Sequence, residues 1–203
     1  MKCIFSLVLS LLMFSCSCFA NSGWLDCEFP GVLKFKFPPT LMLREGIYDD
    51  MLKALKNHKD GIRTNLRLNF VPVDASNRTC FVNVRCLLGR KAVNDFYQPI
   101  SITTDELNRM QGDILLGAAQ DLKTQVDLTN PLEVYDFDDK HSLFMEYHYP
   151  RNNQLWYSYF YHFNDGDKRY RVIIRVRSDK YKEWIQQPND IREIVRTLVP
   201  VRS

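Results

Sequence analysis

Two strand patterns joined by a tight turn dominate the order of hydrophobic and polar residues. They occupy residues 155–178 and meet at an Asp-Gly pair inside the turn 164–167, and such a pair between alternating apolar runs is a strong signal for a β-hairpin. Because side chains alternate along a strand, one face is apolar: Leu155, Tyr157, Tyr159, Tyr161, Phe163, Tyr170, Val172, Ile174 and Val176. The other face mixes aromatic and basic side chains: Trp156, Phe160, His162, Arg169, Arg171, Arg175 and Arg177.

Helical periodicity appears in two earlier segments. Residues 44–58 repeat apolar side chains at helical spacing, with charged residues between them, which predicts an amphipathic helix. Residues 101–125 predict a longer helix, opened by Thr103 and Glu106 in capping-box spacing. Gly117 lies inside that helix, where glycine is unfavourable, so we expect the helix to lie very close to the sheet there.

Strand patterns account for much of the remaining chain, and residues 21–29 predict an irregular segment ahead of them. Asn189 or Asp190 is expected to cap a short closing helix. The expected strands besides the hairpin are residues 32–37, 66–73, 79–88, 132–137 and 143–149. This order predicts an α+β fold, with a central antiparallel β-sheet flanked by helices.

The arrangement resembles a known group of exported proteins. An early strand, a helix, a hairpin, a long helix, an antiparallel meander and a helix after the strand Tyr-Arg-Val-Ile-Ile-Arg-Val-Arg-Ser at 170–178 are similar to the PsbP/DcrB-like α/β/α sandwich proteins. The resemblance covers most of residues 30–200. It implies a small exported or accessory protein that binds other proteins, in a mostly non-enzymatic group. No functional residue is transferred, because no diagnostic motif matches.

The amino-terminal residues predict export. A short basic start, an apolar run and small residues before position 21 are typical of a signal peptide over residues 1–20. The 203-residue chain then leaves residues 21–203 as a single α+β domain, periplasmic or secreted. No later segment approaches the length of a membrane span. The alternative is a lipid anchor at Cys16 or Cys18.

Three cysteines follow the predicted signal peptide. Cys80 and Cys86 are six residues apart on one expected strand, hence about 20 Å apart, whereas a disulfide requires Cα atoms within about 7 Å. They are therefore not expected to pair with each other. A disulfide from Cys27 to one of them, or three buried thiols, are the two interpretations.

The aromatic and basic face of the hairpin is the candidate binding site. Arginine binds carboxylates with two hydrogen bonds, and Trp and Arg are frequent interface anchors, so this face is suited to an anionic group or a partner protein. The candidate residues are Trp156, Phe160, Arg171, Arg175 and His148, the last expected to reach this face from the preceding strand. The alternative is that the arginines pair with acidic residues on neighbouring strands: Glu133, Asp136 and Glu146.

The sequence has no motif for catalysis, metal or cofactor binding, and a net charge of +3 argues against a general nucleic-acid binder. We therefore expect a non-catalytic binding or accessory protein of the cell envelope, which binds another protein through its sheet face or loops. The alternative is a small envelope hydrolase. That hypothesis requires His148, His162 and Glu146 to converge in one pocket.

Overall fold

The computed structural model describes residues 23–59, 63–74, 78–89, 97–137, 139–186 and 190–201. The predicted signal peptide, with Cys16 and Cys18, lies outside the described residues, as does Asn189. Within the described part, Cys27, Cys80 and Cys86 are all unpaired thiols. The last two are buried on one strand, as their spacing predicted.

A seven-stranded antiparallel sheet forms the centre of the molecule. In spatial order its strands are β3 (Leu41–Leu43), β4 (Thr64–Pro72), β5 (Cys80–Leu88), β9 (Lys168–Arg177), β8 (Gln154–Asp165), β7 (Lys140–Arg151) and β6 (Asp127–Phe137). The predicted hairpin is confirmed as β8 and β9, with Asp165 opposite Lys168. Gly166 begins the two-residue turn at φ 59°, a left-handed conformation that favours glycine.

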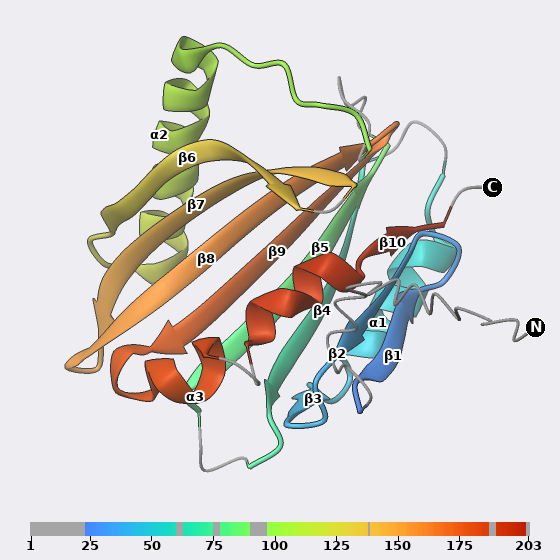
Figure 1. Cartoon of the computed structure of the whole chain (residues 1–203). Coiled ribbons are helices and arrows are strands. Elements are labelled where there is room, and N and C mark those ends of the chain that lie inside the picture. Colours follow the sequence, from blue (N-terminus) through green and yellow to red (C-terminus); the bar gives the residue numbers. More distant parts are fainter. Residues whose placement is uncertain are drawn as a thin grey trace, which may run out of the picture.

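The remaining elements lie on the two faces of this sheet (Figure 1). One face carries α2 (Thr104–Leu122), on the side of β6, β7 and β8. The other face carries a small sheet and several short helices: β1 (Leu25–Phe29), β2 (Leu33–Phe37), β10 (Val199–Pro200), α1 (Ile47–Lys56), η1 (Ser178–Lys180), α3 (Tyr181–Ile185) and η2 (Ile191–Thr197). The predicted α+β class and α/β/α layering are confirmed.

Each face of the sheet has its own hydrophobic core. The larger core buries the apolar face of the hairpin, including Tyr159, Val172 and Ile174, against the small sheet and the short helices. The smaller core lies under α2 and includes Met145, Phe160 and Ile173. The Gln111 side chain of α2 also accepts a hydrogen bond from the backbone N–H of Leu132 in β6, at 2.8 Å.

The structure confirms the capping box at Thr103 and Glu106, but it corrects several predictions. Residues 25–29 form strand β1 where an irregular segment was expected, because they pair with β2. Gly117 does not mark a close approach, since a Cβ atom built there would meet nothing within 4 Å. The closing helix after Asp190 is a 3₁₀ helix. Strand β6 begins at Asp127, whereas the sequence predicted a strand from residue 132. The strand includes Pro131 because it lies at the edge of the sheet, where proline is tolerated.

We expect the Ile174→Ala substitution to lower the free energy of unfolding by about 2–5 kcal/mol, because Ile174 is fully buried on a central strand and truncation leaves a cavity. Urea denaturation followed by circular dichroism measures the change. The control is Leu116→Ala on α2, whose side chain is 60% exposed, and its effect should stay within about 0.5 kcal/mol. Equal losses in both variants would contradict this assignment of the core.

Candidate functional site

Helix α2 covers its face of the sheet unevenly. The core beneath it is built from side chains of β6, β7 and β8, with Ile173 as the contribution of β9, and Figure 1 shows the helix on that side of the sheet. Farther along the same face, the β4 side chains Asn65 and Arg67 are exposed. The β5 side chains there are half-buried. This half of the sheet face therefore presents polar side chains at the surface.

Four of the arginines on this half of the face are grouped where β4, β5 and β9 lie side by side. Arg67 of β4 is the register partner of Arg85 of β5, and Arg85 is the register partner of Arg171 of β9. Side chains directly opposite each other on adjacent strands have Cβ atoms about 5 Å apart. Arg175 is four residues from Arg171 on the same face of β9. We call Arg67, Arg85, Arg171 and Arg175 the arginine ladder.

Neighbouring side chains position the ladder. The Nε atom of Arg85 donates to the side-chain oxygen of Asn83, and the Asn83 amide donates in turn to the Leu68 carbonyl at 3.2 Å. The Arg171 guanidinium lies 5.8 Å from the centre of the Phe160 ring. Its Nε atom is 3.4 Å from Nδ1 of His162, which stacks on the same ring. These contacts fix the side chains of Arg85 and Arg171 against the sheet.

Positive charge exceeds negative charge at the ladder. Burial is the largest cause of a lowered pKa at Arg85, followed by repulsion from Arg67, while Asp121 of α2 acts in the opposite direction. Asp121 and Asp113 line a pocket of about 240 Å³ together with three of the ladder arginines. The Nε atom of Arg175 is buried and has no hydrogen-bond partner among the described residues. An anion bound at the ladder would reduce the repulsion between Arg85 and its neighbouring arginines.

The structure brings together part of the predicted site. Arg171 and Arg175 belong to the ladder, and Phe160 lines the same pocket. Trp156 lies on this face too, but it lines a different cleft. Trp156 and Phe160 are only 5% and 3% exposed, because Phe81 and the side chains under α2 pack against them. They support the surface from beneath and do not project from it.

The predicted position of His148 is wrong. Asn152 and Asn153, both with positive φ, form a two-residue turn that pairs Arg151 with Gln154 and therefore Tyr149 with Trp156. A shift of one residue moves a side chain to the other face of a sheet. His148 consequently faces away from the ladder, where its Nδ1 atom is 2.9 Å from the Thr129 hydroxyl.

The same register separates the residues of the hydrolase hypothesis. Glu146 lies on the face of the larger core, opposite Tyr159, and accepts a hydrogen bond from Asn130 at 2.7 Å. His162 lies on the α2 face beside Phe160. His148, Glu146 and His162 therefore do not converge in one pocket, and the geometry that this hypothesis required is absent.

The predicted pairing of the arginines with acidic residues is also not the arrangement found. Asp136 contacts His141 at 2.7 Å, and Glu146 is bonded to Asn130. Glu133 and Asp136 lie on β6 and Glu146 lies on β7, and neither strand is a neighbour of β9. Arg177 does pair with an acidic residue, but this is Asp179 just beyond its own strand, at 2.6 Å.

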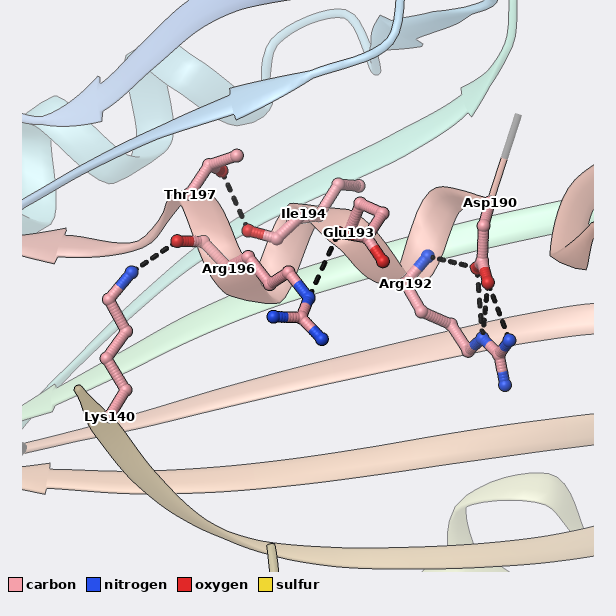
Figure 2. A network of polar contacts seen from close by, with 7 residues as sticks. All are labelled: Lys140, Asp190, Arg192, Glu193, Ile194, Arg196 and Thr197. Carbon is pink, nitrogen blue, oxygen red and sulfur yellow. Dashed lines mark hydrogen bonds and ion pairs between the residues drawn. The ribbon is translucent and has the colours of Figure 1, made fainter. Parts of the chain in front are cut away.

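A second concavity, of about 240 Å³, lies under η2 on the other face. Figure 2 shows how its charges satisfy one another. Asp190 caps η2 and binds Arg192 at 2.6 Å, Glu193 binds Arg196 at 3.1 Å, and Lys140 donates to the Arg196 carbonyl. The Lys140 contact joins η2 to β7, and the two ion pairs lie within the η2 segment. Because these charges are already paired, the concavity is less suited than the ladder to an added charged ligand.

Comparisons with known proteins support the fold. No family model and no curated protein matches the sequence. The solution structure of cyanobacterial PsbP from Synechocystis matches with a TM-score of 0.55 and 11% identity, over 93% of this chain and 98% of that one. A crystal structure from Bacteroides thetaiotaomicron matches with a TM-score of 0.45 and 9% identity, over 84% of this chain and 45% of that one. The match to cyanobacterial PsbP shows that the chain has a PsbP-like fold. Among the described helices, none has the length and hydropathy of a membrane span.

Removing one ladder charge should stabilise the protein at low ionic strength. We expect Arg67→Gln to raise the free energy of unfolding by about 0.2–1 kcal/mol, because like charges on adjacent strands repel. The gain should disappear in about 1 M NaCl, where the screening length is about 3 Å. Urea denaturation at both salt concentrations measures it, and Lys182→Gln on α3 is the control. A destabilised Arg67→Gln at low salt would contradict the repulsion.

The raised pKa of Glu146, on the opposite face of the sheet, predicts that the free energy of unfolding depends on pH. Burial raises its pKa above the ordinary value, so the folded state favours the protonated form and Glu146 reduces stability as the pH rises above about 4.3, the value in an unfolded chain. We expect Glu146→Gln to be more stable than the parent at pH 7. The difference should vanish at about pH 3, and urea denaturation across this range tests it. An advantage independent of pH would contradict the assignment.

Proposed function

We propose that this protein is a non-catalytic accessory protein of the cell envelope, which binds an acidic segment of another protein through the arginine ladder. The observation that carries the proposal is the row of register partners Arg67, Arg85 and Arg171, which places three arginines on adjacent strands of an incompletely covered sheet face. Arg175 extends the row along β9.

The spacing of the ladder suits a protein segment rich in carboxylates. Successive ladder positions across the strands are about 5 Å apart, close to the separation of side chains one turn apart on a helix or two residues apart on a strand. Each arginine can bind a carboxylate with two parallel hydrogen bonds. Arginine is also among the residues that dominate binding energy in protein interfaces.

The rim of the ladder argues against a nucleic acid as its partner. Asp113 and Asp121 of α2 line the same pocket as the arginines, and they would repel a continuous phosphate backbone. A short acidic protein segment carries only a few charges, so its carboxylates can bind the ladder arginines on the sides that face away from the two aspartates. The net charge of +3 is also small for a general nucleic-acid binder.

The fold supports an accessory role. The PsbP-like fold accords with the resemblance to PsbP/DcrB-like proteins, a mostly non-enzymatic group. The predicted signal peptide over residues 1–20 supports an exported location. A lipid anchor at Cys16 or Cys18 would hold the protein at a membrane surface.

A fluorescein-labelled hexaglutamate peptide tests the proposal by fluorescence anisotropy. We expect the parent to bind this peptide with an affinity that falls as salt is added. We expect it not to bind a hexalysine peptide. Reversing two exposed ladder charges in Arg67→Glu/Arg171→Glu should weaken binding at least about tenfold, because each lost charged contact is replaced by repulsion.

The matched control is Lys34→Glu/Lys182→Glu, which changes the net charge equally at exposed positions outside the ladder. Its affinity should stay within about threefold of the parent, well under the 1.4 kcal/mol that a decade represents. Equal weakening in both double variants would show that net charge alone drives binding. If a single-stranded oligonucleotide binds more tightly than hexaglutamate at the same salt concentration, the partner is a nucleic acid and the proposal of a protein partner is wrong.

A further inference from the structure

A cleft of about 470 Å³ lies on the same sheet face as the ladder, toward the β7–β8 turn. Its apolar lining comes from β3, β4, β5 and β8: Met42, Val71, Pro72, Phe81 and Trp156. Three arginines, Arg44, Arg78 and Arg151, also line it, against one carboxylate from Asp74. We call this site the aromatic cleft.

Two rings support the cleft from beneath. The Phe81 and Trp156 rings are 5.6 Å apart between centroids, and Trp156 is nearly completely buried. At the wall, Met42 leaves 42% of its surface exposed. Methionine is flexible and adapts to apolar partners, and a large apolar side chain entering the cleft would remove this surface from water.

The cleft and the ladder are adjacent on the sheet face. Phe81, which lines the cleft, is the register partner of the ladder residue Arg175 and lies on the same face. Phe81 is also four residues before Arg85 on β5, a distance of about 13 Å along the strand. An extended segment of a partner covers that distance with about four residues.

We infer that the partner segment combines acidic residues with a large apolar side chain, so that its carboxylates bind the ladder while the apolar side chain enters the aromatic cleft. This inference rests on the proposed function and specifies the chemistry of the partner. The excess of arginine at both places selects acidic residues along the segment. The apolar lining of Met42, Phe81 and Trp156 selects an aromatic or long aliphatic residue about four positions from the last carboxylate.

Three amidated, fluorescein-labelled peptides test the inference by anisotropy. The first is Glu-Glu-Glu-Ser-Gly-Ser-Phe, the second has serine in place of phenylalanine, and the third has glutamine in place of each glutamate. We expect the first to bind the parent roughly tenfold more tightly than the second, because the phenyl ring is buried in the cleft. The third should bind more weakly than the first by a similar factor or more.

Variants at Met42 separate the cleft from the ladder. In Met42→Asp the affinity ratio of the first to the second peptide should fall toward one, whereas Met42→Leu should keep it. Because the ratio compares two peptides on the same variant, a general effect of the added charge cancels. Circular dichroism confirms that each variant is folded, which the exposed position of Met42 on the edge strand β3 favours.

The outcomes distinguish failure of the inference from failure of the proposed function. If the parent binds the first two peptides equally and Arg67→Glu/Arg171→Glu weakens both, the ladder binds acidic segments but the cleft takes no side chain. If the third peptide binds as tightly as the first, the carboxylates do not contribute to binding. The inference that one segment binds the ladder and the cleft together is then wrong. If neither acidic peptide binds the parent, the proposed function itself fails.

Discussion

The register of β7, β8 and β9 is the constraint on which the rest of the structure depends. Two two-residue turns, at Asn152-Asn153 and Gly166-Asp167, set this register, and a strand with a period of two then assigns every side chain to a face. Tyrosines and β-branched residues enter the larger core as a result. The arginines of β9 are directed together to the other face, which is why a binding surface exists there.

The position of α2 decides how that other face is used. Its apolar stripe covers the aromatic side chains of β7 and β8 and leaves uncovered the part of β4, β5 and β9 that carries the ladder. Under the helix, arginines would require buried partners. Beside it, they remain partly solvated, with Asp113 and Asp121 offsetting some of their charge. The uneven cover thus produces both a stable second core and a positively charged surface next to it.

The candidate site could be predicted in part. Arg171 and Arg175 were found because they alternate with the apolar residues of a recognisable hairpin. Arg67 and Arg85 show the same alternation in the other hairpin, but their place in the site depends on β5 pairing with β9, a contact between segments about 90 residues apart in the chain. His148 was misplaced because a turn of two asparagines sets a register one residue from the one assumed.

The sequence by itself determined the elements whose signals are local: the Asp-Gly hairpin, the capping box of α2, both helical stripes and the α+β class. These depend on turn chemistry and on the alternation of neighbouring residues, which act over a few positions. The tertiary structure alone decided the strand order, the pairing that makes a strand of residues 25–29, and the burial of Trp156 and Phe160. The strand order and the burial of the two rings require distant segments to pack together, and packing depends on the combined shape of surfaces that no single stretch of sequence contains.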